Sequence, residues 1–404
     1  MTISTAKKWI EYSLEELLSY EQPTPYIVES TDYNDNYKTP VLTAGKSFII
    51  GYTKETEGIY NKLPVIIFDD FTTATQYVNF PFKVKSSAMK ILTPNLDSVL
   101  PKFIFYRMQT IQFDASTHKR YWIQQYSKIK VKVPPLDEQK RIVAKIEELF
   151  SELDNGVETL KKTKQQLAVY RQAVLKEAFE GKFTVHKPIE MELAWASINE
   201  IKSLPILPKE WKYTALSNLG DLGRGKSKHR PRNDSKLFEN GKYPFIQTGD
   251  VKAAKRYITE YSKMYGDFGL KQSKLWTAGT LCITIAANIA ETAFLGIDAC
   301  FPDSIVGFTP YEYISSEYVK YFIESQKLKL WAFAPATAQK NINLDTLEKL
   351  IIPYCSPIEQ KEVVDGIEER MTICDSIEQT VDTALQQADA MRQSILKKAF
   401  EGEL

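Results

Sequence analysis

The chain contains one long segment twice. Residues 138–183 begin EQKRIVAKIEELF and end RQAVLKEAFEGKF, and residues 359–404 begin EQKEVVDGIEERM and end RQSILKKAFEGEL. The two copies align without a gap at an offset of 221 residues, with 19 identities in 46 positions. An internal repeat constrains the fold strongly, because both copies should adopt the same structure. At 404 residues the chain exceeds the usual single-domain size. The order of variable segment and repeat therefore indicates a tandem duplication.

The correspondence continues outside the repeat. At the same offset, residues 121–131 align with 342–352, which pairs Ile123 with Leu344, Tyr126 with Leu347 and Ile129 with Leu350. At a different offset, the domain starts share three apolar positions, Trp9, Leu14 and Leu17 matching Trp211, Leu216 and Leu219. We therefore predict variable domains at residues 1–132 and 184–351, each followed by a helical region, at 133–183 and 352–404.

Both copies of the repeat have the apolar spacing of a long helix with one buried seam. Steps of three and four over several heptads are typical of a coiled coil, although Gly156, Thr163, Tyr170 and Arg370 interrupt them. The predicted seam positions are Ile142, Ile146, Leu149, Leu153, Leu160, Leu167 and Val174, then Val363, Ile367, Cys374, Ile377, Val381, Ala384, Ala388, Met391 and Ile395.

Each helix would run about 40 residues, or roughly 60 Å. Prolines lie just upstream of each predicted start, and Gly181 and Gly402 stand where a C-terminal cap is expected. A helix of that length with an apolar seam needs a partner. The simplest partner is the other copy, packed antiparallel about an approximate two-fold axis. A long dimerisation helix unrelated to nucleic acid fits the periodicity equally well.

Composition bounds the class of protein. The content of 12% aromatic residues favours β-rich domains. The four cysteines form no CxxC pair, which indicates reduced core thiols rather than a zinc site or disulfides. The N-terminal segment lacks the apolar stretch of a signal peptide, and no run approaches about 18 apolar residues. We therefore expect a cytoplasmic protein without a membrane partner.

Positive charge gathers on the two variable domains. Residues 1–132 have a net charge of +3 and residues 184–351 of +4, whereas the helical regions have 0 and −6. This division suits domains that face an anionic ligand. The sharpest feature is GRGKSKHRPR at 223–232, because long cationic side chains on a loop suit phosphate contacts. A solvated surface loop is the alternative.

Cations are more scattered in the first domain. They include Lys90 and Arg107, besides the positions Lys83, Lys85, His118, Lys119 and Arg120. Tyr121 and Trp122 follow directly, and aromatics at that spacing favour a core role. At the repeat offset His118 corresponds to Gln339 and Lys119 to Lys340. A positive position in both copies fits a phosphate contact made twice, or a structural role at the base of each domain.

We find no constellation for catalysis. The sequence lacks a phosphate-binding GxxxxGK[ST] loop, a dinucleotide fingerprint and the Asn/Asp-Pro-Pro-aromatic motif of base-directed methyltransferases. The three histidines are not spaced for a metal. Asp69 and Asp70 end an apolar strand, where a turn is favoured over a metal-binding pair. We expect no cofactor and no metal, with any chemistry left to partners.

The repeats and both domains carry a family resemblance. The tandem EQK…RQ..LK.AFEG segments closely resemble the helical regions of type I restriction-modification specificity subunits. In the second domain, residues 243–252 and 279–310 look like the core strands of a target-recognition domain. In the first, residues 41–60 and 64–92 are similar to another variant of that domain. The resemblance covers essentially the whole chain.

The resemblance implies an α+β fold: two mixed α/β target-recognition domains separated by two long helices, packed as an antiparallel coiled coil with pseudo-two-fold symmetry. It implies a non-catalytic subunit that binds double-stranded DNA, each domain reading one half of an asymmetric bipartite site. The helical spacer would set the gap and dock methyltransferase subunits, and motor-nuclease subunits would join. The assembled complex would be an adenine DNA methyltransferase and an ATP-dependent endonuclease.

We predict DNA contacts at basic or polar loop positions. In the first domain these are Lys83, Lys85, His118, Lys119 and Arg120, and in the second Arg224, Lys226, Lys228, Arg230, Arg232, Gln247, Thr248, Gln339 and Lys340. Two other classes of protein remain. One is a coiled-coil scaffold with protein-binding domains. The other is an independent DNA-modifying enzyme, which the missing motifs argue against.

Overall fold

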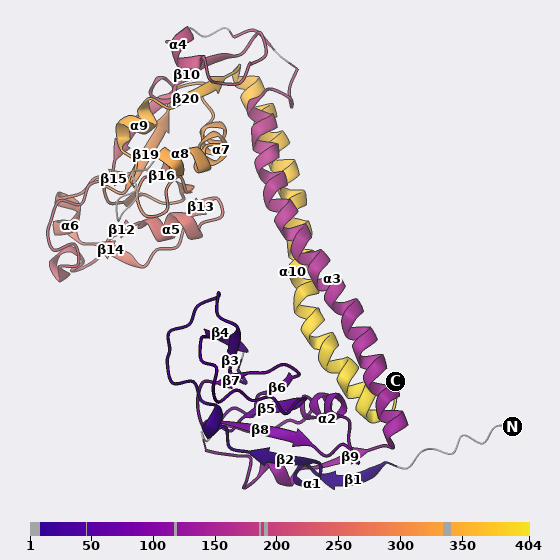
Figure 1. The fold of residues 1–404 in the computed structure, drawn as a ribbon. Coiled ribbons are helices and arrows are strands. Elements are labelled where there is room, and N and C mark those ends of the chain that lie inside the picture. The colour runs from indigo at the N-terminus through magenta and orange to yellow at the C-terminus, as the bar shows by residue number, and fades with distance from the viewer. Residues whose placement is uncertain (1–8, 46, 117–118, 186, 190–192, 334–340) are drawn as a thin grey trace. The chain divides into compact units, whose positions relative to one another are not determined.

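The computed structural model describes residues 9–404 except 46, 117–118, 186, 190–192 and 334–340. The chain divides into two compact units. Unit 1 consists of Met1–Lys162 with Val381–Leu404, and unit 2 of Thr163–Thr380. Each unit holds one mixed α/β domain and parts of two long helices, α3 (Leu136–Phe179) and α10 (Pro357–Glu401) (Figure 1). The predicted α+β fold with two domains and long helices is confirmed.

The domain of unit 1 contains three small sheets. A four-stranded sheet has the order β2-β8-β5-β6, a three-stranded sheet the order β4-β3-β7, and β1 pairs with β9. Its strands are β1 (Ile10–Ser13), β2 (Leu18–Glu21), β3 (Thr39–Leu42), β4 (Ile49–Thr53), β5 (Val65–Asp69), β6 (Thr75–Val78), β7 (Lys83–Val84), β8 (Met89–Pro94) and β9 (Lys130–Val133). Its helices are α1 (Leu14–Leu17), η1 (Thr24–Tyr26), α2 (Pro101–Met108) and η2 (Tyr126–Lys128).

The domain of unit 2 has a five-stranded sheet of order β11-β19-β16-β17-β13, a four-stranded sheet of order β14-β12-β18-β15, and the pair β10-β20. Its strands are β10 (Lys212–Ala215), β11 (Gly220–Arg224), β12 (Tyr243–Phe245), β13 (Tyr257–Ile258), β14 (Lys263–Tyr265), β15 (Leu275–Trp276), β16 (Leu281–Thr284), β17 (Thr292–Leu295), β18 (Ala299–Cys300), β19 (Ile305–Pro310) and β20 (Ile351–Tyr354). Its helices are α4 (Ile198–Ile201), η3 (Leu216–Asn218), η4 (Ser235–Leu237), α5 (Thr248–Ala253), α6 (Asp267–Lys271), α7 (Ser316–Ser325), α8 (Lys327–Phe333) and α9 (Leu344–Glu348).

The apolar strands form the domain cores. In β5 the run Val65–Phe68 is fully buried, and β16 and β17 are buried along their whole length. Such continuous apolar runs are expected of strands covered on both faces. All four cysteines are buried and free, as the composition predicts. Among the described residues, no helix combines the length and hydrophobicity needed to cross a membrane.

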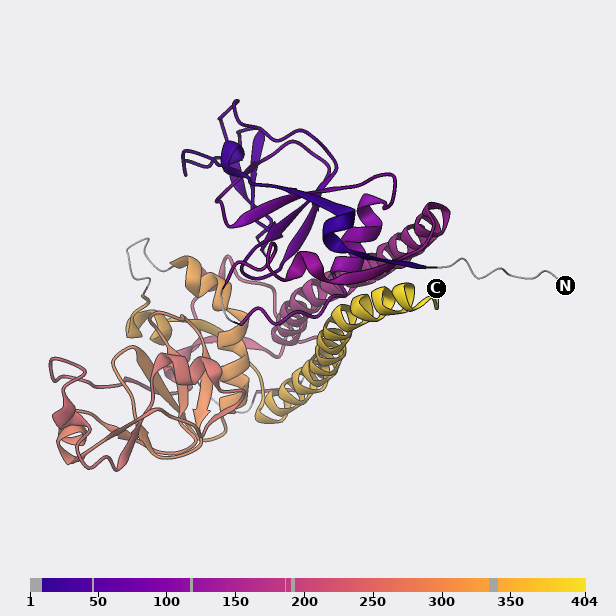
Figure 2. The same cartoon turned by 90° about the horizontal axis from the view of Figure 1, so that it is seen from below.

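Within each unit, α3 and α10 lie side by side and run antiparallel (Figures 1 and 2). In unit 1, the Arg392 guanidinium pairs with Asp154 and lies over the Phe150 ring at 4.6 Å. In unit 2, Arg171 bonds to Asp375 at 2.7 Å and to Glu378 at 3.1 Å. The predicted antiparallel pairing therefore holds inside each unit.

Most predicted seam positions are shielded, but two are wrong. Ile377 is 40% exposed and Met391 is 53% exposed. The following residues, Glu378 and Arg392, turn toward the partner helix instead and form its cross-helix ion pairs. An α-helix drifts against a strict seven-residue repeat, so a seam extrapolated along one helix slips by a residue.

Each domain core is completed by both long helices. In unit 1 the core cluster takes Ile142 and Ile146 from α3, and Leu396 and Ala399 from α10. In unit 2 the equivalent cluster takes side chains from the opposite ends of the same helices, Val174, Leu175, Ala178 and Phe179 from α3 and Val363, Val364 and Ile367 from α10. Because the helices bury apolar side chains in the domains, each domain is fixed to the helix pair of its own unit.

Candidate nucleic-acid interface

The basic loop of residues 223–232 leaves the five-stranded sheet at the end of β11. The Gly225 amide donates a hydrogen bond of 2.9 Å to the Ile305 carbonyl at the start of β19. A Cβ atom on Gly225 would lie only 2.3 Å from the carbonyl oxygens of Phe301 and Pro302. Glycine is therefore required here, because the loop leaves the sheet in close contact with the neighbouring backbone.

The inner side of the basic loop is tied to the domain. The buried Ser227 hydroxyl lies 3.3 Å from the Tyr265 hydroxyl, and the Ser273 hydroxyl donates to the Lys226 carbonyl at 2.8 Å. His229 is also held in place. Its ring Nε2 bonds to the Asp234 carboxylate at 2.7 Å, and its backbone amide donates to the Gln272 side chain at 3.0 Å. The hydrogen bond from His229 lowers the pKa of the Asp234 carboxyl. The loop is thus held in one shape before any ligand arrives.

The outer side of the basic loop presents cations. Lys226, Lys228 and Arg230 are exposed, whereas the intervening Ser227 is buried. The Arg230 guanidinium donates to the carbonyls of Ser227 at 2.7 Å and His229 at 2.8 Å, which leaves its charge uncompensated. Among the described residues, neither Lys226 nor Lys228 forms an ion pair. Three positive side chains are therefore available to an anion.

The other two arginines of the loop bind Asp303. Arg224 donates through Nε and Nη2 to the Asp303 carbonyl, at 2.9 and 2.7 Å. Arg232 makes an ion pair with the Asp303 carboxylate at 2.9 Å and remains 49% exposed. The carboxylate offsets the charge of Arg232, so its attraction for phosphate is weaker than that of the three free cations. Both arginines also brace the loop.

Gln247 and Thr248 stand at the start of α5. Both are half-buried, and the Gln247 amide bonds to the Asp250 carboxylate at 2.7 Å. This contact is a helix-capping interaction, in which an acidic side chain satisfies a free amide of the first turn. No hydrogen bond joins either residue to the basic loop within the described ranges. The structure gives Gln247 a structural role, and the DNA contacts predicted for Gln247 and Thr248 stay predictions.

In the first domain the structure contradicts one predicted DNA contact, Lys83. Lys83 is 4% exposed, and its ammonium pairs with Glu55 at 2.8 Å and donates to the Glu57 carbonyl at 2.8 Å. Its charge is neutralised inside the domain and is not offered to DNA. Lys85, two residues later, lies just past the end of β7 and is exposed. Positions two apart share a face only while the strand continues, so the difference arises because β7 ends at Val84.

Of two further cations in this domain, Lys90 is buried and Arg107 is half-buried. Lys90 is 1% exposed and pairs with Asp70 at 3.1 Å. The Arg107 guanidinium lies over the Phe400 ring at 5.4 Å, and burial lowers its pKa. Lys119 and Arg120 are exposed. His118, Gln339 and Lys340 fall outside the described residues.

The structural predictions for this region are confirmed. Tyr121 and Trp122 are buried in the core cluster, at 2% and 1% exposure. Asp69 accepts hydrogen bonds of 2.9 Å from the amides of Phe71 and Thr72, which is the geometry of a turn. Asp70 accepts one from the Trp122 amide at 2.8 Å. The acidic pair therefore closes a turn and fixes the aromatic segment.

Sequence reasoning missed a pair of buried glutamines that join each domain to its helix. The Gln139 side chain accepts from the Leu100 amide at 2.7 Å and donates to the Pro134 carbonyl at 2.8 Å. Gln360 accepts from the Ser315 amide at 2.9 Å and donates to the Cys355 carbonyl at 3.0 Å. Leu100 and Ser315 are the N-cap residues of α2 and α7. Gln139 and Gln360 occupy the same position in the two repeats. Their identity is the one signal in the sequence that could have drawn attention to them.

Other contacts at the two junctions correspond as well. In unit 1, Lys102 pairs with Glu147, and the Phe103 and Phe400 rings lie 5.3 Å apart. In unit 2, Arg256 pairs with Glu368 at 2.9 Å, and Tyr318 and Phe179 lie 5.1 Å apart. Glu147 and Glu368 are equivalent repeat positions, as are Phe179 and Phe400. Burial, reinforced by these glutamates, raises the pKa of Tyr106 in α2 to about 12 and also raises the pKa of Tyr321 in α7.

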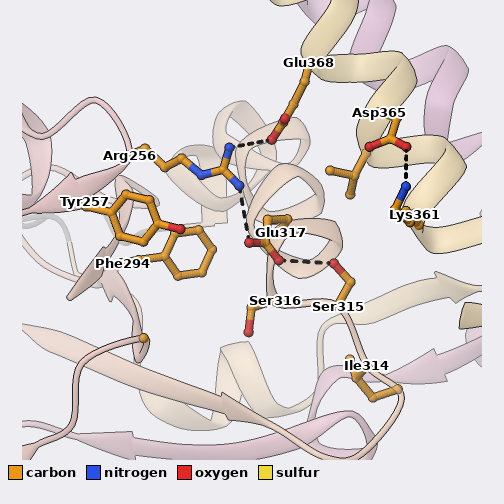
Figure 3. Close-up of a pocket in the computed structure, with 12 residues that line it drawn as sticks. Arg256, Tyr257, Phe294, Ile314, Ser315, Ser316, Glu317, Lys361, Asp365 and Glu368 are labelled. Carbon is orange, nitrogen blue, oxygen red and sulfur yellow. Dashed lines mark hydrogen bonds and ion pairs between the residues drawn. The ribbon is translucent and has the colours of Figure 1, made fainter. Parts of the chain in front are cut away.

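A cleft of about 570 Å³ lies in unit 2, where the domain meets α10. Figure 3 shows Arg256 reaching Glu317 and Glu368, with Lys361 bonded to Asp365. Both cations of the cleft are thus paired, and its carboxylates outnumber them. Such a site repels phosphate, so we assign the cleft to the junction and not to the nucleic-acid interface.

The match to a protein family covers most of the chain. The model of the type I restriction modification DNA specificity domain matches residues 6–168 and again residues 208–387. The chain is 32% identical over 388 residues to the EcoR124I/EcoR124II specificity subunit of Escherichia coli, covering 90% of this chain and 87% of that protein. It is 24% identical over 430 residues to the StySPI specificity subunit of Salmonella potsdam, covering 100% and 88%.

Solved structures share the fold. One chain, from a structure on complex assembly and conformational transition of the type I R-M system, has a TM-score of 0.72 at 17% identity and 98% coverage of both chains. The HsdS subunit from Thermoanaerobacter tengcongensis has a TM-score of 0.56 at 16% identity, with 98% and 97% coverage. Two matched specificity domains, a whole-length relative and a shared fold give one conclusion: this chain belongs to the DNA specificity subunits of type I restriction-modification systems.

Proposed function

We propose that this specificity subunit reads a split DNA site, with one half-site bound by each domain and the gap set by the helix pair. The observation that supports this most directly is the correspondence of the two junctions. Gln139 and Gln360 grip the first turn of α2 and α7 in the same way. Two readers attached by equivalent contacts suit a ligand whose halves repeat along one axis, as in other two-fold DNA readers.

The proposed DNA-binding surface of the second domain is centred on the basic loop. Lys226, Lys228 and Arg230 supply exposed charge, and the braced loop positions them without further ordering. Such contacts fix the register on the duplex and supply affinity, while base edges supply specificity. The remaining proposed positions are Lys85, His118, Lys119 and Arg120 in the first domain, and Arg224, Arg232, Gln247, Thr248, Gln339 and Lys340 in the second.

We further propose that the two domains read different half-sites. Their sheets differ in strand number and order, so their base-reading loops are not superimposable copies. The target would therefore be asymmetric and bipartite. In this scheme the subunit is non-catalytic, in keeping with its family role. Methyltransferase subunits dock on the helical spacer, and motor-nuclease subunits complete an adenine methyltransferase and ATP-dependent endonuclease.

The four buried, free cysteines suit a reducing compartment. We accordingly propose that the complex acts in the cytoplasm, where its DNA is found.

A selection experiment tests the proposed function. The subunit, copurified with its methyltransferase partner, is incubated with random DNA, and bound fragments are sequenced. We expect enrichment of a two-part motif with an undefined gap of fixed length. A scaffold with protein-binding domains would enrich no motif at moderate salt. Enrichment of a single uninterrupted motif would contradict the proposal that each domain binds one half-site.

A further inference from the structure

A second loop leaves the five-stranded sheet beside the basic loop. Strands β11 and β16 both pair antiparallel with β19, so they run in the same direction and end at the same edge. The Gly225 amide bonds to the Ile305 carbonyl, and the Ile285 amide bonds to the adjacent Ser304 carbonyl, both at 2.9 Å. The segment after β16, residues 285–290, therefore begins two strands away from the basic loop, a distance of about 10 Å.

This second loop holds two alanines in an unfavourable backbone conformation. Ala287 has φ 65° and Ala290 has φ 62°, the left-handed region that side chains other than glycine rarely adopt. Buried neighbours maintain the conformation. Ile285 and Ile289 are each 1% exposed, and the fully buried Thr284 hydroxyl accepts from the Glu291 amide at 3.0 Å and donates to the Asn288 carbonyl. Backbone strain held by its surroundings in this way is typical of functional positions.

Between the two isoleucine anchors, the loop presents Ala286, Ala287 and Asn288. Ala287 is exposed, and Ala286 and Asn288 are half-exposed. The backbone N–H of Asn288 donates a hydrogen bond of 2.9 Å to the Ala286 carbonyl, so the chain reverses direction here. Its side-chain amide bonds to nothing in the part of the chain that the structure describes. Ala286 forms an antiparallel bridge with Asn341, so the loop tip offers the Asn288 amide and the Ala287 methyl group, without any charge.

The two adjacent loops suit two different parts of a DNA duplex. The basic loop suits phosphates, whereas the neutral tip suits base edges. An asparagine side chain can bond to both N6 and N7 of adenine in the major groove, and an alanine methyl can pack on the methyl of thymine. The small side chains let the backbone approach closely. The separation of about 10 Å between the two loops is comparable with a major groove of about 12 Å.

We infer that residues 286–288 read an A·T base pair in the major groove of the half-site bound by the second domain. Asn288 contacts adenine and Ala287 the thymine methyl, while the basic loop lies on the adjacent phosphates. This inference rests on the proposed function, and it names the base that one loop selects.

The test uses the full subunit copurified with its methyltransferase partner, in the random-DNA selection described above. The Asn288→Ala variant should lose its preference for adenine at one position of one half-site, with about 5- to 150-fold weaker discrimination there. The other half-site and the gap should be unchanged, and they serve as an internal control. Asn288→Asp, which keeps the size but cannot donate, should shift the preference toward cytosine, because a carboxylate accepts from N4.

The possible outcomes distinguish a failure of this inference from a failure of the proposed function. If the unaltered subunit enriches a bipartite motif and both Asn288 variants enrich the same motif, the assignment of this loop is wrong and the proposed function stands. If the unaltered subunit enriches no bipartite motif, the proposed function fails as well. A uniform loss across all positions, with an unchanged thermal unfolding midpoint, would also overturn base reading by Asn288.

Discussion

At the scale of residues, charge in the sequence was a poor guide to charge at the surface. Lys83 and Lys85 are two positions apart, yet one is paired with Glu55 inside the domain and the other is exposed. The sequence contains both the lysine and the glutamate, but not the long-range contact between them. Residue identity across the repeat was more informative. The repeat contains the same residue at Gln139 and Gln360, a signal that we did not use, and no composition or charge argument could reveal their buried bonds.

Glu359 offers a stability test at this scale. It is fully buried, and it accepts a hydrogen bond from Trp211 Nε1 at 2.9 Å and from the Ser356 hydroxyl at 2.9 Å. Burial alone would raise its pKa, but the hydrogen bonds from Trp211 and Ser356 outweigh burial and lower it. Glu359→Gln should cost about 1–3 kcal/mol of unfolding free energy near neutral pH, because the new amide faces donors.

The sign of the pH dependence follows from the lowered pKa of Glu359. A carboxyl with a depressed folded pKa contributes stability above its ordinary pKa of 4.5, and this contribution fades as the pH falls through the folded value. Urea unfolding at pH 7 and pH 4 should therefore show a smaller gap between variant and parent at pH 4. The matched control is Glu138→Gln, the repeat counterpart, which pairs with Arg141 near the surface. An equal loss in both variants would contradict this account.

At the scale of elements, periodicity predicted the two long helices well, but it predicted less well which of their residues lie in the buried seam. Seam positions such as Ile146 and Val381 are buried, whereas Ile377 and Met391 are not. The difference arises from the drift of the helix against its repeat, which depends on the partner helix. The strands after β11 show a similar limit. In the β11–β19 pair, Gly220 lies opposite Pro310, 90 residues away, so the adjacency of the loops after β11 and β16 cannot be predicted from local pattern.

The basic loop can be tested as an element. Replacing Lys226 and Lys228 by Ala should weaken binding to all DNA sequences alike and lower the slope of log K against log salt by about 2. Titrations of the complex at several salt concentrations measure both quantities. Lys202 and Lys209 are the matched control pair, because both are exposed and belong to the segment between α4 and β10. Figure 1 shows α4 and β10 at the end of the domain away from α6. A slope that stays unchanged would remove the basic loop from the interface.

At the scale of the whole molecule, the duplication predicted more than any single motif did. It placed the two domain starts in correspondence, and the structure bears this out. The Leu14 amide bonds to the Ile129 carbonyl at 3.0 Å, and the Leu216 amide to the Leu350 carbonyl at 2.9 Å. What duplication could not predict is the interior of each domain, since the two sheets have diverged in size and order.

The proposed spacer makes a prediction about length. Adding one helical turn to both helices at equivalent points, after Lys161 and after Asp382, should lengthen the rod by about 5.4 Å. Duplex DNA rises about 3.4 Å per base pair, so the gap in the selected motif should grow by one or two base pairs. Both half-sites should keep their sequences. The same residues inserted at Ile206, which is 96% exposed, provide the control. A motif with its original gap would show that the helices do not set the spacing.

The way each core is completed has a consequence for synthesis of the chain. The core of the first domain includes Leu396 and Ala399, and Phe400 packs on Phe103. The ribosome adds these side chains only after it has made the whole of the second domain. The first domain therefore emerges before the second but completes its core after it. Its apolar face stays uncovered until the final turn of α10 has been made. A nonsense codon in that last turn would damage the N-terminal domain, hundreds of residues upstream, and leave the core of the second domain whole.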